Sequence, residues 1–534
     1  MIEDAPALAI RGVMLDVSRG KIPTLEPLYR VADALALCKL NHLELYLEGF
    51  SFAYPGFEDY WAEGDPLTGE DIRALDGYCR ERFIDLVPNQ NSLGHMGPWL
   101  AKPELAPLAE TPGGFSVHGM TIPPTTLDPA DPGSLVLVGR MAAGLLPNFT
   151  SDWFHVGLDE PFELGRGKSR ERAERDGVES VYLDYVEKLA AQVEGFGKRM
   201  LMWGDILGRH PGAERRLPAG VTVMEWGYEA EHPYEKRCAA LEAAGVPFLV
   251  CPGTGSWSTF GGLTDNMLAN TRAAARAAKA HGGLGLVTTD WGDGGHVQYL
   301  PVSWAGIAAA AALAWGEELP EPELAGWLDR FVYRDKAGVT GNFSLALGRY
   351  ARFEECALPC RALAAMSVDE GLVSRDAWET ALRQSVAILA AFVPPEVLEV
   401  YTANYERRGP MDYAGLTEYL DGLEAALAQS RMEAPDGPLV RREYQNAIRM
   451  IRLGEGLRRV VTAGEPPAAQ AKAVRELLGL ARDILPEHEA VWLARNRAAG
   501  LSITMEAFRR LEAQLAQRLA ELETTPETTK EESI

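Results

Sequence analysis

Several features that would assign a function class at once are missing from this sequence of 534 residues. No run approaches the roughly 18 uncharged apolar residues that a membrane-spanning helix needs, and the Ala-rich stretch 305–315 is too short. The first ten residues, MIEDAPALAI, contain neither the basic segment nor the long apolar segment of a secretory signal peptide. We therefore expect no membrane partner and no export signal.

Cysteine and histidine are both scarce. None of the six cysteines forms a CxxC pair, and this usage fits a reducing, cytoplasmic location. Cys356 and Cys360 are four residues apart on a predicted helix, which fits either a metal-binding pair or two packed thiols. We favour packed thiols, because no further Cys or His cluster lies nearby. The nine histidines show no HxH or HExxH spacing, so we expect no metal and no cofactor.

Positive charge is also in deficit. The chain has 52 Lys and Arg against 76 Asp and Glu, a formal net charge of -24. A surface this acidic repels phosphate backbones, so we expect no nucleic-acid partner. Hydrophobic residues make up 47% and charged residues 24%, which is typical of a globular protein. The length predicts more than one domain.

Up to about residue 318, eight short apolar segments alternate with eight amphipathic helical segments. The predicted strands are 8–17, 42–47, 83–88, 153–158, 199–203, 221–226, 247–251 and 285–290. The predicted helices are 25–39, 69–81, 134–146, 178–196, a weak one near Ala213, 234–244, 265–281 and 303–314.

This alternation predicts parallel strands joined by helical crossovers, and eight units are the count of a (β/α)8 TIM barrel. A doubly wound open sheet is the alternative, but no glycine-rich phosphate turn follows the first strand. In a TIM barrel, active sites are built from the loops that follow the strands. We therefore expect catalytic and binding side chains at those positions.

The stretch 152–168, DWFHVGLDEPFELGRGK, carries the strongest signal. Its first half alternates, so that Trp153 and His155 share one face of a strand and Leu158 lies on the other. Asp159 and Glu160 follow at the C-terminal end of that strand. Two acids in one cleft can be driven to different pKa values, which suits one general acid and one anion.

Aromatic side chains recur at the ends of the later strands. Four strand ends carry a tryptophan: Trp203, Trp226, Trp257 and Trp291. Tryptophans at the same end of successive strands predict a wall, and an aromatic wall beside carboxylates suits a sugar.

Beyond Leu319 helical periodicity dominates, with apolar stripes in 413–430, 441–460 and 503–522. We expect a catalytic barrel over 1–318, an α-helical domain over 319–523 and a polar, disordered tail over 524–534. Heptads are not sustained, yet the helical domain could still mediate a homodimer.

Four motifs together resemble glycoside hydrolase family 20, the β-N-acetylhexosaminidases. The family's H-x-G-G-D-E stands here as 155–160, with Leu158 in place of the second Gly. Its R-G-x-x-L-D stands as 11–16, its G-H as 94–95, and its Trp-x-acid as 291–293 with Asp in place of the usual Glu. The resemblance covers residues 8 to about 315.

Two features of the family are not seen in this sequence. The predicted barrel starts almost at Met1, so we expect a chain without the family's usual N-terminal α/β domain, similar to the cytoplasmic-type bacterial branch that acts on small glycans. The Y-L-D near strand seven is also missing, and Tyr228 is our candidate for that tyrosine.

The resemblance implies hydrolysis of a terminal N-acetylhexosamine with retention, through attack by the substrate's own 2-acetamido oxygen. Glu160 would act as general acid and then base, and Asp159 would orient the acetamido group. The remaining implied roles are sugar-hydroxyl binding by Arg11 and Asp293, support of the acid by His95 and His155, and an aromatic wall of Trp203, Trp226, Tyr228, Trp257 and Trp291.

Two rival functions remain open at this point. One is another barrel glycosidase resembling family 84, which uses two aspartates; the Asp159–Glu160 pair argues against it. The other is a barrel that binds a glycan without chemistry, for which Leu158 is the warning sign. Since Leu158 faces away from the cleft in the predicted strand, we expect it to be tolerated.

Overall fold

The computed structural model describes residues 4–117, 120–316, 318–389 and 393–524. Its core is one sheet of eight parallel strands in the order β3-β2-β1-β10-β9-β8-β7-β6. The strands are β1 (Ile10–Asp16), β2 (His42–Tyr46), β3 (Asp85–Pro88), β6 (Trp153–His155), β7 (Arg199–Trp203), β8 (Thr222–Trp226), β9 (Phe248–Cys251) and β10 (Gly285–Asp290).

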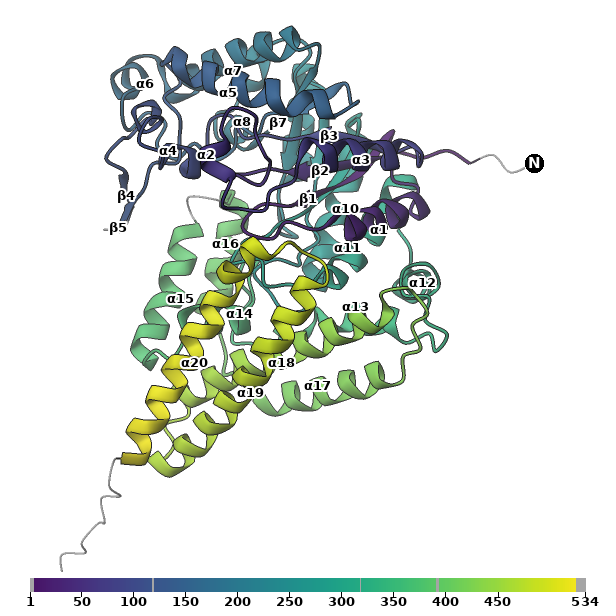
Figure 1. The fold of residues 1–534 in the computed structure, drawn as a ribbon, viewed down its shortest axis with the longest axis vertical. Coiled ribbons are helices and arrows are strands. Elements are labelled where there is room, and N and C mark those ends of the chain that lie inside the picture. Colours follow the sequence, from purple (N-terminus) through teal and green to yellow (C-terminus); the bar gives the residue numbers. More distant parts are fainter. Residues whose placement is uncertain (1–3, 118–119, 317, 390–392, 525–534) are drawn as a thin grey trace, which may run out of the picture.

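The sheet curves into a barrel that closes between β3 and β6. A parallel bridge joins Asn89 to His155, and the Gln90 N–H donates to the His155 carbonyl at 2.9 Å. With this closure the eight strands form the predicted TIM barrel, surrounded by helices in the upper part of Figure 1. The long helices of this shell are α1 (Leu25–Leu37), α3 (Gly69–Arg80), α5 (Pro132–Leu145), α7 (Val178–Gly195), α9 (Tyr234–Ala244), α10 (Thr264–Ala280) and α11 (Trp304–Trp315).

The period-two pattern of the strands separates two apolar layers. Outward-facing residues such as Phe154, Val156 and Leu158 pack into the large core between strands and helices. Inward-facing residues, among them Met14 and Trp153, form a second cluster inside the barrel. The alternation predicted for the fourth strand is confirmed, and Leu158 lies on the outer side.

Several short elements escaped prediction because each has too few residues to show a period. In the Pro-rich segment after β3, β4 (Phe115–Val117) and β5 (Met120–Ile122) form an antiparallel pair. After β7 comes α8 (Asp205–Arg209), and the weak helix expected near Ala213 is a single 3-10 turn over Ala213–Arg216. The remaining short helices are α2 (Glu58–Trp61), α4 (Gly97–Leu100) and α6 (Arg170–Asp176).

Beyond the barrel the described chain is helical, as expected. The helices are α12 (Glu321–Trp327), α13 (Thr340–Leu347), α14 (Leu363–Glu370), α15 (Arg375–Leu389), α16 (Pro395–Glu406), α17 (Tyr413–Ala428), α18 (Gly437–Thr462), α19 (Pro467–Leu493) and α20 (Leu501–Thr524). They form the lower part of Figure 1. The proposed division at residues 318/319 stays a prediction, and the tail after Thr524 lies outside the described residues.

Cys356 and Cys360 correct one expectation. Both precede α14, in an irregular segment, because Pro359 between them prevents a continuous helix. Cys356 packs in a small cluster with Trp378, whereas Cys360 packs against the cluster inside the barrel. The two thiols therefore belong to different cores and are not a packed pair.

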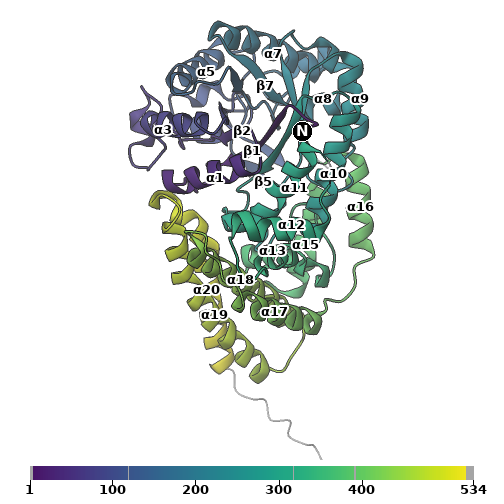
Figure 2. The same ribbon diagram turned by 90° about the vertical axis from the view of Figure 1, so that its right-hand side faces the viewer.

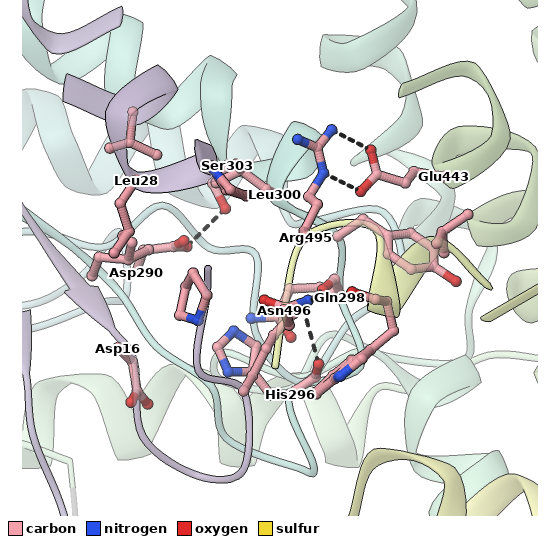
Figure 3. Close-up of a pocket in the computed structure, with 18 residues that line it drawn as sticks. Asp16, Leu28, Asp290, His296, Gln298, Leu300, Ser303, Glu443, Arg495 and Asn496 are labelled. Carbon is pink, nitrogen blue, oxygen red and sulfur yellow. Dashed lines mark hydrogen bonds and ion pairs between the residues drawn. The ribbon is translucent and has the colours of Figure 1, made fainter. Parts of the chain in front are cut away.

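The loop between α19 and α20 docks onto the loop between β1 and α1 (Figure 2). The Thr24 N–H donates to the Arg495 carbonyl at 2.9 Å, and the Arg497 N–H donates to the Ile22 carbonyl at 2.8 Å. A cavity lies behind this contact, and the buried Arg495–Glu443 ion pair forms part of its wall (Figure 3). The helical segment is thus tied to the loop that follows the first barrel strand. Within the described residues, no helix is both long and apolar enough to span a membrane.

Candidate active site

Asp159 and Glu160 lie at the carboxyl end of β6, in a loop with unusual backbone geometry. Gly157, Leu158 and Glu160 all have positive φ, at 69°, 77° and 47°. A Cβ on Gly157 would lie 2.0 Å from the Asn91 side-chain oxygen, so this position needs glycine. Leu158 adopts a left-handed conformation that is costly for a branched side chain, and its complete burial offsets that cost.

The loop after β3 approaches the acid pair closely. A Cβ on Gly94 would lie 2.2 Å from the Asp159 carbonyl oxygen, so a larger residue would push the two loops apart. Gly94 thereby allows His95, itself at a φ of 56°, to reach both acids. Glycine at position 94 thus lets the loop after β3 approach the loop of the acid pair closely enough for His95 to contact both acids.

His95 bridges the two carboxylates. Its Nε2 lies 3.2 Å from Asp159 Oδ2 and 3.5 Å from Glu160 Oε2. Burial alone would lower the pKa of His95, but Asp159, Glu160 and Glu48 outweigh burial and raise it well above its usual value. Burial likewise acts to raise the pKa of Asp159, but His95 overcomes this and holds that pKa below its usual value. The site therefore contains an imidazolium beside an ionised aspartate.

The polar network continues from His95 to the first strand. His95 Nδ1 lies 3.7 Å from Glu48 Oε2, and Arg19 Nη2 lies 3.3 Å from the same oxygen. Arg19 also pairs with Asp16 at 2.7 Å, and Asp16 accepts the Gly292 N–H at 2.9 Å. Sequence reasoning missed Asp16, Arg19 and Glu48 as site residues. The available signal was their position: Asp16 is the last residue of β1, and Arg19 and Glu48 lie just beyond the ends of β1 and β2.

Arg11 is a correction, because the structure places it at the opposite end of the barrel. Its side chain donates to the carbonyls of Leu8, Ala9 and Lys39 and lies over the Trp315 ring. Five residues of strand separate it from Asp16, a rise of roughly 16 Å. Arg11 therefore cannot contact a ligand at the carboxyl ends of the strands, and Arg19 is the cation of the site.

Asp293 and Trp291 come from the loop after β10. Asp293 Oδ1 lies 3.3 Å from Arg19 Nε, and the Arg19 guanidinium lies 5.3 Å from the centre of the Trp291 ring. Burial raises the pKa of Asp293, while Arg19 opposes that rise. The structure thus brings Asp293 together with the acid pair and places Arg19 beside it.

The five predicted aromatic residues form one continuous wall. Trp226 stacks on Tyr228, Tyr228 meets Trp257 edge-on, and the Trp203 and Trp291 ring centres are 6.0 Å apart. The Trp291 indole N–H donates to the Tyr228 hydroxyl at 2.7 Å, which joins the two halves of the wall. The indole N–H groups of Trp203 and Trp226 are buried and have no protein partner in the described structure.

His155 lies beneath the site. Its Nδ1 meets the carboxylate of Glu44 and lies 3.0 Å from Asn89 Nδ2, and its ring meets the Trp203 ring edge-on. Burial raises the pKa of Glu44, but His155 and His42 outweigh burial and lower it to about 2. His155 therefore supports Trp203 and the loop of the acid pair from a buried layer.

The helical segment also reaches the wall. Cys360 Sγ donates to Glu229 Oε1 at 3.4 Å and, like Trp226 and Tyr228, packs against the cluster inside the barrel. Burial raises the pKa of the Cys360 thiol well above its usual value, so the sulfur is a neutral group. The rim of the site is thus shared between the barrel and the segment before α14.

Within the described residues, one group has a geometry that could suit a metal ion. It consists of His95, Asp159 and Glu160, whose ligand atoms lie within 4.8 Å of one another. A protonated imidazole has no lone pair to offer, and the raised pKa of His95 keeps it protonated. The donor set thus fits a hydrogen-bonded acid pair better than a metal centre, and the absence of a cofactor stays a prediction.

Comparison with known proteins points to one family. Residues 9–257 match the model described as glycosyl hydrolase family 20, catalytic domain. "Beta-hexosaminidase 1" of Coccidioides posadasii is 27% identical over 247 residues, which cover 42% of this chain and 41% of that protein. "Beta-hexosaminidase" of Porphyromonas gingivalis is 27% identical over 251 residues, which cover 42% of this chain and 31% of that protein.

A crystal structure of a β-N-acetylhexosaminidase is similar in fold, with a TM-score of 0.50 and 18% identity over 64% of this chain and 78% of that one. At this level of identity the likeness supports the barrel fold alone. The match covers about two fifths or less of the length of the two curated relatives.

Proposed function

Because residues 9–257 belong to the catalytic domain of glycosyl hydrolase family 20, we propose that this protein is a retaining exo-β-N-acetylhexosaminidase. It would remove terminal N-acetylglucosamine or N-acetylgalactosamine from small glycans. The observation that carries the proposal is the His95 imidazole between Asp159 and Glu160, at the open end of a barrel lined by tryptophans. Relatives named beta-hexosaminidases support it.

The proposed chemistry follows the substrate-assisted route of the family. The acetamido carbonyl oxygen of the substrate attacks the anomeric carbon, and Glu160 protonates the departing glycosidic oxygen. An oxazolinium ion forms, and Glu160 then takes a proton from the water that opens it. The carboxylate of Asp159, kept ionised by His95, accepts the acetamido N–H and stabilises the positive charge.

Substrate binding is assigned to the groups around the acid pair. Arg19 donates to sugar hydroxyls as a planar fork, and Asp293 beside it accepts from them. The wall of Trp203, Trp226, Tyr228, Trp257 and Trp291 encloses the acetamido group and excludes water. The unpartnered indole N–H groups of Trp203 and Trp226 are donors that a bound substrate or water would satisfy.

The proposal is tested with Glu160→Gln on two N-acetyl-β-glucosaminides, one with an alkyl leaving group and one with a dinitrophenyl leaving group. Loss of general acid catalysis predicts a fall in kcat of about 10²–10⁴-fold on the alkyl glycoside and a much smaller fall on the aryl one. Asp59→Asn, on the exposed face of α2, is the matched control. Equal losses on both substrates would remove the acid role, and an inactive wild-type protein would remove the proposed function.

Two further expectations stay predictions: a cytoplasmic location and a homodimer through the helical segment. Light scattering of the purified protein measures the second directly.

A further inference from the structure

Asp205 is a third carboxyl group beside Asp159 and Glu160, and no step of the proposed chemistry uses it. It is the first residue of α8, two positions after Trp203. Its Oδ2 accepts the backbone N–H of Glu160 at 3.3 Å. Its Oδ1 is buried and has no hydrogen-bond partner within the described structure.

The loop that carries Glu160 needs outside support, because Glu160 itself has a positive φ of 47°. Three contacts to this loop supply that support. The Trp203 N–H donates to the Gly157 carbonyl at 3.0 Å, and the Tyr182 hydroxyl donates to the Leu158 carbonyl at 3.1 Å. The third contact is the one from the Glu160 N–H to Asp205, and it is the contact nearest to the acid itself.

The turn that presents Asp205 is fixed independently of the loop it supports. The Gly204 N–H donates to the Met224 carbonyl at 3.0 Å. The Arg237 guanidinium donates to the Gly204 carbonyl at 2.9 Å and pairs with the buried Glu225. Asp205 is therefore held by β8 and α9, and its carboxylate is a stationary acceptor for the Glu160 N–H.

Electrostatics adds a second effect. Burial raises the pKa of Asp205 to about 7, and Asp159 and Glu160 add to that rise while Arg209 opposes it. The other titratable groups that face it are Tyr182 on α7 and Arg237 on α9. Above about pH 7 Asp205 is an anion, so the Glu160 N–H then donates to a charged acceptor, which is stronger than a neutral one.

We propose that Asp205 is a positioning residue for the general acid: its side chain accepts the Glu160 N–H and so holds the left-handed backbone from which Glu160 projects. This inference rests on the proposed function, since it assigns Glu160 the acid role.

Two variants test this role. Asp205→Asn keeps an oxygen that can accept the Glu160 N–H, so its kcat should stay within about threefold of wild type. Asp205→Ala removes the acceptor, and its kcat should fall by about 10- to 100-fold on an alkyl N-acetyl-β-glucosaminide.

The dependence of the rate on the leaving group separates a loss of positioning from general damage to the site. A misplaced acid matters little for a dinitrophenyl glycoside, so Asp205→Ala should retain most of its rate on that substrate. Asp59→Ala, on the exposed face of α2, is the matched control, and the melting temperature of each variant is measured alongside. Equal losses on both substrates in Asp205→Ala, or a loss in Asp205→Asn as large as that in Asp205→Ala, would overturn the inference. A wild-type protein without activity on either glycoside would instead overturn the proposed function.

Discussion

Arg19 and Asp293 form an ion pair across the mouth of the barrel, with Nε 3.3 Å from Oδ1. They are 274 positions apart in the sequence, and the pairing of β1 with β10 brings them together. Arg19 also touches Asp16 and Glu48, so three carboxylates surround one guanidinium. A fork of donors held in this way is preorganised for a ligand that carries hydroxyl groups.

Arg19→Lys should lower kcat/KM on an aryl N-acetyl-β-glucosaminide by about 10- to 100-fold, since a charge-assisted hydrogen bond contributes about 1.5–3 kcal/mol. A lysine keeps the charge but loses the planar fork. The measurement is steady-state kinetics at a fixed pH.

Arg11→Lys is the matched control, because Arg11 lies on β1, shortly before Arg19 in the sequence, but at the opposite end of the barrel. We expect its kcat/KM to stay within about twofold of wild type, while its melting temperature falls as the carbonyl contacts are lost. The reverse pattern, with Arg11→Lys catalytically impaired and Arg19→Lys intact, would refute our placement of the sugar-binding cation.

Arg11 and Arg19 also show how much of the fold and of the site can be predicted from the sequence alone. The alternation of strands and helices predicts the eight-stranded barrel, because period and order are local properties of the chain. Whether Arg11 or Arg19 faces the cleft depends on where β1 ends. Strand ends are set by pairing with β2 and β10, which a single sequence does not show. Arg19 lies beyond that end and Arg11 lies before it.

The contact between the barrel and the helical segment depends on the buried ion pair between Arg495 and Glu443 (Figure 3). Arg495→Met leaves the Glu443 carboxylate buried without its partner, so we expect a loss of about 3–5 kcal/mol in the free energy of unfolding. Urea unfolding followed by tryptophan fluorescence measures it.

A double variant tests the cause. Arg495→Met combined with Glu443→Leu removes both charges, and it should recover much of the lost stability because a buried pair can be replaced by apolar groups at little cost. If the double variant is as unstable as the single one, the uncompensated charge is not the reason for the loss.

His488 makes a prediction about acid stability. Burial between Tyr299 and Phe508 lowers the pKa of His488 to about 3, with Lys21 adding to the shift. Between pH 6.5 and 3 the unfolded chain binds a proton at this histidine and the folded chain does not. The contribution of His488 to stability is therefore lost as the pH falls through this window, with a slope approaching about 1.4 kcal/mol per pH unit.

His488→Gln removes this titration and keeps a polar partner for the Tyr299 hydroxyl, so the melting temperature should decline less steeply with acidification than in the wild type. His281→Gln serves as the control. His281 is a surface residue whose pKa is raised by Glu242 and Glu235, so its loss should not flatten the acid slope. Parallel curves for His488→Gln and wild type would contradict the assignment.

Parts of the candidate site lay beyond sequence reasoning for a different reason. The acid pair, His95 and Trp291 belong to short motifs, and the other tryptophans follow predicted strands, so all of them could be named in advance. Glu48 and Asp205 belong to no motif that we identified, and only the folded loops bring them to His95 and Glu160. Cys360 comes from a segment that follows the barrel, and nothing local links it to Glu229.

The last prediction concerns Asp159 and the substrate's own amide. Asp159 is held by His95 at 3.2 Å and stays ionised, so it could in principle attack the sugar itself. In the substrate-assisted route it only steers the acetamido group. The two roles differ in what the substrate must carry, because a 2-hydroxy sugar lacks the attacking amide. We therefore expect the 2-hydroxy aryl glycoside to be hydrolysed very poorly by the wild-type protein.

Asp159→Asn should then lose most activity on the 2-acetamido glycoside, yet it should still bind a thiazoline analogue of the intermediate, more weakly than wild type, because the tryptophan wall remains. Mass spectrometry after incubation with a 2-fluoro glycoside should find no glycosyl ester on Asp159, since a carboxylate that only orients an amide forms no bond to carbon. Glu160→Gln, which lacks the acid but keeps Asp159, should also show no adduct. A stable ester on Asp159, or similar rates for the 2-acetamido and 2-hydroxy sugars, would make Asp159 the nucleophile and rule out catalysis by the substrate's amide.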